Sequence, residues 1–307
     1  MVILDVLRLE IIMLINRLFY MNITYKCNNG CIFCISNTTK RKLFDLEKPL
    51  KMIMQVDKEY NFTEQDIFIV NGGEPTLSDD FVEIINFLNK KRMKIIVYSN
   101  GRKLKETSIR NIITSTNIRW IIPFYGLQKT NDYYTNVDGS FKDTYEAIST
   151  IPETHRNKIS LKLLVKEKKQ IKEFIRLIEL LDWKSEIHIS LILDDNIQER
   201  IKLAKKLKRI LFFLFSKQLK IKISNVPICC LPQKMKKILN YYNKMKEKGI
   251  KKYYFIDYNK IYPINYDKNH VWMEKCKKCR HIHYCVDNGK KYRALNFNKD
   301  EIFLDLE

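Results

Sequence analysis

The stretch LFYMNITYKCNNGCIFC, residues 18–34, joins an apolar run to three closely spaced cysteines. The run Leu18–Tyr25 has the length and composition of a buried β-strand. The cysteines that follow, Cys27, Cys31 and Cys34, are separated by three and then two residues. Such tight spacing suits a soft metal or an iron–sulfur cluster, because thiolate ligands must converge in space. We therefore expect a first strand that leads directly into a metal-binding loop.

Further apolar runs alternate along the chain with segments of helical periodicity. The runs span residues 66–70, 94–101, 118–126, 159–165 and 187–193. Helices are expected near residues 45–60, from Ser78 with Ser-Asp-Asp as N-cap and acidic first turn, after Gly101, after Ser140 and over 169–182. Six strands separated by helices predict an α/β fold with a parallel sheet, either an open layer or a barrel.

Three chemically distinctive loops follow the first three expected strands. The cysteine loop follows the first strand, Gly72–Pro75 (GGEP) follows the second, and Ser99–Gly101 (SNG) follows the third. Active sites of parallel α/β folds lie at the carboxyl ends of the strands. We therefore expect the three loops to share one edge of the sheet.

In this combination the chain resembles the radical S-adenosylmethionine (SAM) superfamily over about residues 18–222. Residues 125–148 are also similar to a segment of its peptide-modifying and cofactor-making members. Those members often have His-Asp where this chain has Asn131-Asp132. The resemblance implies a partial (β/α)6 barrel of parallel strands, followed by a small cysteine-rich domain.

The resemblance also implies cofactors and residue roles. Cys27, Cys31 and Cys34 would ligate a [4Fe–4S] cluster whose fourth iron chelates the methionine part of SAM. An electron from the cluster would cleave SAM to a 5′-deoxyadenosyl radical, which abstracts hydrogen from the substrate. The implied SAM contacts are Phe33 on the adenine, Gly72, Gly73, Glu74 and Pro75 at the amino group, and Ser99 and Asn100 near the ribose or carboxylate.

Other interpretations of these motifs exist. The three cysteines could form a zinc site that lacks its fourth ligand, although structural zinc sites are closed and four-coordinate. The GGEP and SNG segments could be ordinary turns at strand ends.

The remaining five cysteines form a second group near the C-terminus. They are Cys229, Cys230, Cys276, Cys279 and Cys285. This group resembles the shortened auxiliary-cluster domain called twitch, of the larger SPASM group. Gly289 stands where a full SPASM domain would have another cysteine, so the resemblance implies one auxiliary [4Fe–4S] cluster. Its implied ligands are Cys229, Cys276, Cys279 and Cys285, with Cys230 spare or able to replace Cys229. The alternative is a four-cysteine zinc knuckle.

Composition limits the other function classes. The 307 residues carry a net charge of +21, which suggests a nucleic acid, an anionic membrane or an acidic substrate as partner. The densest basic stretch, residues 200–222, has leucine and isoleucine at helical spacing and predicts an amphipathic helix with a solvated face. Nucleic-acid binding is therefore possible but not favoured. The sequence has neither an apolar run long enough to cross a membrane nor a secretion signal, so we expect a cytoplasmic protein without disulfides.

These observations predict three segments: an amphipathic extension over residues 1–17, a radical SAM core over 18–222 and an auxiliary-cluster domain over 223–307. We expect an enzyme that modifies a peptide or protein side chain. The alternatives are the same chemistry on a nucleotide, sugar or cofactor precursor, or a non-catalytic iron–sulfur or nucleic-acid-binding module. Expected partners are a reductant such as flavodoxin or ferredoxin and, for a peptide substrate, possible help from a separate peptide-binding protein.

Overall fold

The computed structural model of the protein forms two compact units. The described residues are 17–34, 48–114, 118–192, 197–224, 226, 252–257 and 260–263. Of these residues, the first unit contains 17–34, 48–114, 118–123, 131–160, 252–257 and 260–263, and the second contains 124–130, 161–192, 197–224 and 226. The cysteines at 229, 230, 276, 279 and 285 lie outside the described residues, as does the expected N-terminal extension up to residue 16.

The first unit is built on a largely parallel sheet with the strand order β4-β3-β2-β1-β8-β9. Its strands are β1 (Arg17–Thr24), β2 (Ile67–Gly72), β3 (Lys94–Tyr98), β4 (Ile118–Phe124), β8 (Lys252–Asp257) and β9 (Lys260–Pro263). Neighbouring strands pair in parallel from β4 to β8, and only β9 is antiparallel. The carboxyl ends of β1, β2 and β3 therefore lie at one edge of the sheet.

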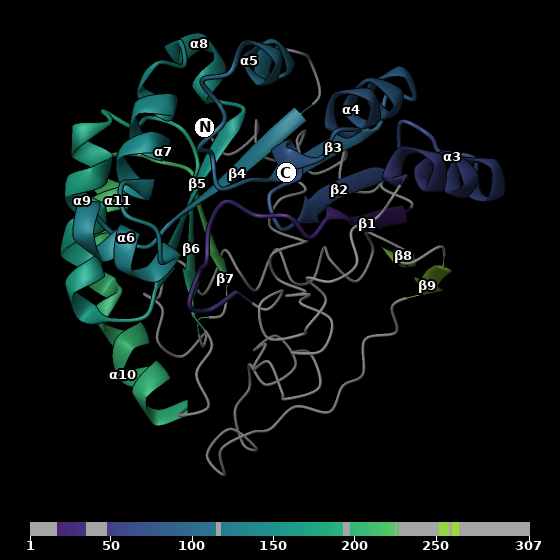
Figure 1. The fold of residues 1–307 in the computed structure, drawn as a ribbon. Helices are drawn as coiled ribbons and strands as arrows, with labels where there is room; N and C mark the ends of the chain where they lie inside the picture. Colours follow the sequence, from purple (N-terminus) through teal and green to yellow (C-terminus); the bar gives the residue numbers. More distant parts are fainter. Residues whose placement is uncertain are drawn as a thin grey trace, which may run out of the picture. The chain divides into compact units, whose positions relative to one another are not determined.

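Helices follow β1, β2, β3 and β4 along the chain. They are α3 (Pro49–Tyr60), the short 3-10 helix η3 (Pro75–Leu77), α4 (Phe81–Lys90), α5 (Thr107–Thr114), α6 (Gln128–Thr135), α7 (Ser140–Ser149) and α8 (Glu153–Arg156). Figure 1 shows α3, α4 and α5 lying along one face of β1 to β4. Strand β1 is buried on both faces, and the ring of Phe19 stacks on those of Phe68 and Tyr254. Burial of both faces is typical of a central strand in a parallel sheet.

The second unit contains the parallel strands β5 (Ile159–Val165), β6 (Ile187–Leu191) and β7 (Ile221–Ser224), in the order β7-β6-β5. Its helices are α9 (Lys168–Leu180), α10 (Ile197–Lys206) and α11 (Lys208–Ser216), and α9 packs on α11. A capping box of Glu167 and Gln170 starts α9. The predicted α/β alternation is thus confirmed, whereas closure into a partial barrel stays a prediction.

Two local expectations were wrong. The helix expected from Ser78 begins at Phe81 with Asp80 as N-cap, because Ser78 ends the preceding 3-10 helix instead. The single basic helix over 200–222 is divided into α10, α11 and strand β7. Lys222 can lie inside β7 because its ammonium pairs with the buried carboxylate of Glu186 at 3.1 Å.

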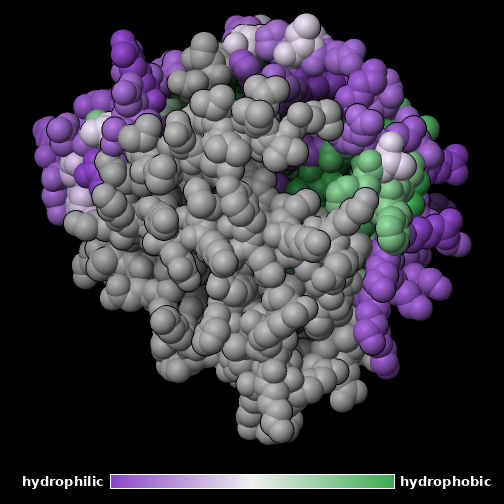
Figure 2. All heavy atoms as spheres, turned by 180° about the vertical axis from the view of Figure 1, so that it is seen from behind, coloured by the Kyte–Doolittle hydropathy of each residue, from purple (hydrophilic) through white to green (hydrophobic). Residues whose placement is uncertain are grey.

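The surface in Figure 2 is hydrophilic over most of the described residues in view, with one hydrophobic area. No helix in the described part of the chain is long and apolar enough to cross a bilayer.

A row of basic side chains crosses the second unit. Lys162, His188 and Lys222 occupy paired register positions on β5, β6 and β7, and all three are buried. Burial lowers the pKa of His188 well below the usual 6.5, and the charges of Lys162 and Lys222 lower it further. The imidazole is therefore neutral in the folded protein at neutral pH.

The neutral His188 predicts a loss of stability in acid. In the unfolded chain this histidine takes up a proton as the pH falls below about 6.5, whereas the folded protein resists protonation. The free energy of unfolding should therefore decrease below that pH, by up to about 1.4 kcal/mol per pH unit from this one group. Denaturant unfolding at several pH values between 7.5 and 5.5, on the order of half a unit apart, measures the slope.

The variant His188→Gln should lack this component of the slope. His155→Gln, which changes a partly exposed histidine of α8, is the matched control and should keep it. Equal slopes in wild type and His188→Gln would contradict the assignment.

Candidate metal centre at the ends of the first three strands

The three N-terminal cysteines lie in the loop directly after β1, and none of these three is in a disulfide. The backbone N–H of Asn29 donates to Cys27 Sγ at 3.4 Å, and that of Cys34 donates to the Cys31 carbonyl at 3.0 Å. Cys27 as a whole residue is exposed, yet partial desolvation of its thiol raises its pKa, and the nearby Glu74 and Cys34 add to this. Hydrogen bonds from Asn29 and Asn100 act in the opposite direction. The loop thus carries three soft sulfur donors within eight residues.

The two glycines of the GGEP segment allow the second loop to lie directly against the start of the cysteine loop. Gly73 N–H donates to the Thr24 carbonyl and Glu74 N–H to the Lys26 carbonyl, each at 2.8 Å. A Cβ atom on Gly73 would lie 2.2 Å from the Lys26 oxygen, and one on Gly72 would lie 2.2 Å from the Thr24 oxygen. Gly72 also has a φ of +142°. Only glycine fits this close approach of two backbones.

The carboxylate of Glu74 is fully buried and links the second loop to the third. Its Oε1 accepts hydrogen bonds from Thr76 Oγ1 at 2.6 Å and Ser99 Oγ at 2.8 Å, and its Oε2 accepts from the Asn100 N–H at 2.6 Å. The Thr76 N–H also donates to Oε1, at 3.2 Å. Burial raises the pKa of Glu74, whereas these hydrogen bonds, led by that of the Thr76 hydroxyl, oppose the rise. Two of the four donors are backbone N–H groups, so the site requires an acceptor.

The predicted residues Ser99 and Asn100 are both engaged within the protein. The Ser99 hydroxyl donates to Glu74 and accepts the Gly101 N–H at 3.0 Å. The Asn100 amide donates from Nδ2 to Asn28 Oδ1 at 2.6 Å and accepts the Arg102 N–H on Oδ1 at 3.1 Å. The third loop is therefore attached to the cysteine loop on one side and to Glu74 on the other.

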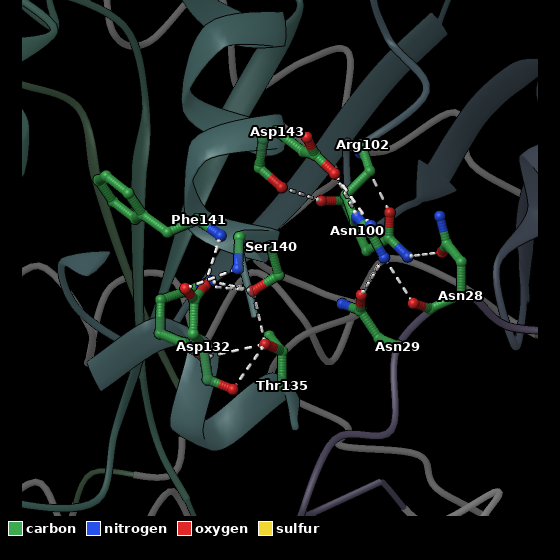
Figure 3. A network of polar contacts seen from close by, with 12 residues as sticks. Asn28, Asn29, Asn100, Arg102, Asp132, Thr135, Ser140, Phe141 and Asp143 are labelled. Atoms are coloured by element: carbon green, nitrogen blue, oxygen red, sulfur yellow. Dashed lines mark hydrogen bonds and ion pairs between the residues drawn. The ribbon is translucent and has the colours of Figure 1, made fainter. Parts of the chain in front are cut away.

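Arg102 makes a second connection between these loops (Figure 3). Its Nε and Nη2 both donate to Asp143 Oδ2 of α7, at 3.1 and 2.9 Å. Its Nη1 donates to the Asn28 carbonyl at 2.5 Å and to Asn29 Oδ1 at 3.2 Å. The guanidinium thus joins α7 to the backbone just after Cys27.

The end of α6 holds the rest of the cysteine loop. Gly30 N–H donates to the Thr135 carbonyl at 2.8 Å, and Ile32 N–H donates to the Tyr134 carbonyl at 2.9 Å. The rings of Phe33 and Tyr134 are 5.6 Å apart between centroids. The cysteine loop therefore contacts all three of its neighbours: the second loop, the third loop and α6.

The turn from α6 into α7 is fixed by Asp132 (Figure 3). Its carboxylate accepts hydrogen bonds from Gly139 N–H at 2.9 Å, and from Phe141 N–H and Ser140 Oγ at 2.8 Å. Asn131 is buried and donates to Ser140 Oγ at 3.1 Å. Both residues stabilise the turn that presents Tyr134 and Thr135.

The prediction that the three loops share one edge of the sheet is confirmed by these hydrogen bonds. The sequence did not point to Asn28, Arg102, Asp143 or the carbonyl groups of α6. Arg102 directly follows the SNG segment, but Asp143 lies 41 residues further along the chain. Among the described residues, no three metal-ligating side chains converge on a site for a single ion. A cluster has no such requirement, because each thiolate binds a different iron.

The buried carboxylate yields a direct prediction. In Glu74→Gln, the new amide NH2 would face a backbone N–H whichever oxygen it replaces, because Oε1 and Oε2 each accept one. We expect a loss of about 1–3 kcal/mol in the free energy of unfolding, measured by denaturant titration of the cluster-free protein.

The matched control for this measurement is Glu83→Gln, which makes the same change on the exposed side of α4 and should stay within about 0.5 kcal/mol of wild type. If both variants unfold at the same denaturant concentration as wild type, Glu74 does not hold the two loops together.

Comparison with known proteins gives an independent view of this chain. The mycofactocin maturase MftC of Mycolicibacterium smegmatis is 24% identical over 133 residues, covering 42% of this chain and 32% of the relative. The Fe-coproporphyrin III synthase of Methanosarcina barkeri is 22% identical over 169 residues, covering 52% of this chain and 40% of the relative. The chain thus matches less than half the length of these curated relatives.

Among solved structures, native anSMEcpe with bound AdoMet and Cp18Cys peptide shares the fold with a TM-score of 0.62. It is 13% identical, and the match covers 88% of each chain. The model of the radical SAM superfamily matches residues 21–181, which is more than half of the chain and contains all three loops described above. The chain therefore belongs to the radical SAM superfamily.

Proposed function

We propose that this protein cleaves SAM reductively at a [4Fe–4S] cluster bound by Cys27, Cys31 and Cys34. The observation that carries the proposal is the loop itself: Cys27, Cys31 and Cys34, none of these three in a disulfide, follow the end of β1 beside the glycine backbone of the second loop. The family implies a [4Fe–4S] cluster and SAM. When bound, the cluster supplies the electron that divides SAM into methionine and a 5′-deoxyadenosyl radical, which takes a hydrogen atom from the substrate.

The donor set fits this cluster. Three thiolates can hold three irons of a four-iron cluster and leave the fourth iron open for an added ligand. The alternative of a zinc site would need a fourth ligand for closure. The Glu74 carboxylate near Cys27 already accepts four hydrogen bonds, and the asparagine, arginine and backbone groups around the loop hold it in place.

The protein's own residues would bind and orient SAM. In the proposal, the backbone of Gly72–Pro75 meets the amino group, and Phe33 packs on the adenine. The Glu74 carboxylate already has four donors within the protein, so its contribution is to fix that backbone. Ser99 and Asn100 are proposed near the ribose or carboxylate, where Asn100 also orients Asn28 beside Cys27.

The proposed substrate is a peptide or protein side chain. This is supported by a fold neighbour whose structure contains a bound peptide and by the likeness to a mycofactocin maturase. A small molecule is the second candidate, which the likeness to a coproporphyrin-processing enzyme favours.

We further propose an auxiliary [4Fe–4S] cluster on Cys229, Cys276, Cys279 and Cys285, within a C-terminal domain over residues 223–307 that follows a core over 18–222. The proposed setting is the reducing cytoplasm, where thiols stay unpaired. A flavodoxin- or ferredoxin-like reductant would supply the electron, and a separate protein could help to present a peptide substrate.

The reaction is tested by product formation. The protein is reconstituted with iron and sulfide without oxygen, reduced with dithionite and given SAM, and 5′-deoxyadenosine is measured by mass spectrometry. We expect product from the wild type and a loss of at least about 100-fold when Cys27, Cys31 and Cys34 are all changed to Ala, because the bound electron donor is absent.

Iron content provides the control. Wild type should hold about eight irons per chain, and the triple variant about four, if each cysteine group holds one four-iron cluster. The variant Cys276→Ala with Cys279→Ala should also hold about four irons, but it should still cleave SAM. A wild type that retains its N-terminal cluster yet gives no 5′-deoxyadenosine, with candidate peptides present as well, would rule out the proposed reaction.

A further inference from the structure

We propose that Arg102 is a positioning residue that keeps the cysteine loop in its cluster-binding conformation. The inference rests on the proposed function, because it concerns the loop whose cysteines would bind the cluster. Arg102 lies in the third loop and donates to the carbonyl of Asn28 and the side chain of Asn29, which lie between Cys27 and Cys31.

The guanidinium of Arg102 binds Asp143 through Nε and Nη2 and binds the cysteine loop through Nη1. One edge of the guanidinium donates twice to Asp143 Oδ2, and the ion pair measures 2.9 Å. The remaining Nη1 points to the carbonyl of Asn28 and the side chain of Asn29 (Figure 3). The arginine side chain is only 18% exposed, so solvent screens this contact less than a surface ion pair. Helix α7 is thereby connected to the cysteine loop through the ion pair of Asp143 with Arg102.

The loop is held at alternate residues along its length. Asn28 is bound by Arg102 and Asn100, Gly30 by the Thr135 carbonyl, and Ile32 by the Tyr134 carbonyl. Two of these points lie between Cys27 and Cys31, and the third lies between Cys31 and Cys34. Cys27 therefore directly precedes a fixed backbone position, and Cys31 lies between two of them.

Among these contacts, that of Arg102 is the charged one. Hydrogen bonds from a guanidinium are stronger than those between neutral groups. The contact also needs several donors in fixed directions, which arginine provides and lysine does not. Fixing the loop during folding removes the cost of ordering it when the cluster binds. Loss of Arg102 should therefore weaken retention of the cluster while leaving every thiol in place.

The test measures cluster retention rather than turnover. Reconstituted protein is mixed with bathophenanthroline disulfonate and dithionite without oxygen, and iron release from the N-terminal cluster is followed in the background Cys276→Ala with Cys279→Ala. We expect Arg102→Met to release iron roughly ten-fold faster than the background, the factor that corresponds to about 1.4 kcal/mol. Arg102→Lys should fall between them, and Asp143→Asn should also accelerate release.

The matched control is Arg110→Met, which removes an arginine of α5 that donates to Thr150. Its release rate should equal that of the background. Electron paramagnetic resonance of the reduced cluster, with and without SAM, provides a second measurement. In Arg102→Met, the spectral shift caused by SAM should be smaller, or the lines broader, than in Arg110→Met.

The outcomes are distinct. Release from Arg102→Met at the background rate, with an unchanged SAM response, overturns the inference and leaves the proposed function standing. If Arg102→Met does not fold, as judged by its thermal unfolding, Arg102→Lys and Asp143→Asn decide by the same criterion. A background protein that binds no iron at all contradicts the proposed function, and the inference fails with it.

Discussion

The arrangement of this site depends on one buried carboxylate. Glu74 is completely excluded from solvent, and its two oxygens receive two hydroxyl groups and two backbone N–H groups. Burying an ionised carboxylate without hydrogen-bond partners would cost too much free energy, so the four donors must lie around it. The carboxylate in turn supplies the acceptors that these donors need. Because the donors come from the second and third loops, their relative position is fixed by chemistry rather than by loop length.

The cysteine loop is held against the second loop by close contact between their backbones. Gly72 and Gly73 have no side chains, so the carbonyls of Thr24 and Lys26 can approach them directly. Asn100 and Arg102 then reach across to Asn28, and α6 contributes two carbonyl groups from the other side. The three thiols thus lie on a loop that the surrounding protein holds in place through its own hydrogen bonds.

Much of this could be predicted from the sequence, because the signals are local. The apolar runs of β1 and β5, the cysteine spacing and the two loops after β2 and β3 each occupy a short stretch. The contacts that the sequence did not reveal join residues that are far apart along the chain. Arg102 pairs with Asp143, and Lys222 is accepted inside β7 only because Glu186 lies beside it. The prediction that Ser78 is an N-cap was wrong because Ser78 is the C-cap of the 3-10 helix Pro75–Leu77. Such competition between neighbouring elements cannot be read from periodicity.

The most direct test of this account asks whether SAM binds to the cluster held by Cys27, Cys31 and Cys34. Electron–nuclear double resonance should be recorded on the reduced protein with SAM that carries ¹⁵N at the methionine amino group, using a Cys276→Ala, Cys279→Ala background to remove signals from the other cysteine group. The account predicts a ¹⁵N coupling that requires the three N-terminal cysteines. A reduced cluster on those cysteines that shows no ¹⁵N coupling at saturating SAM would contradict it.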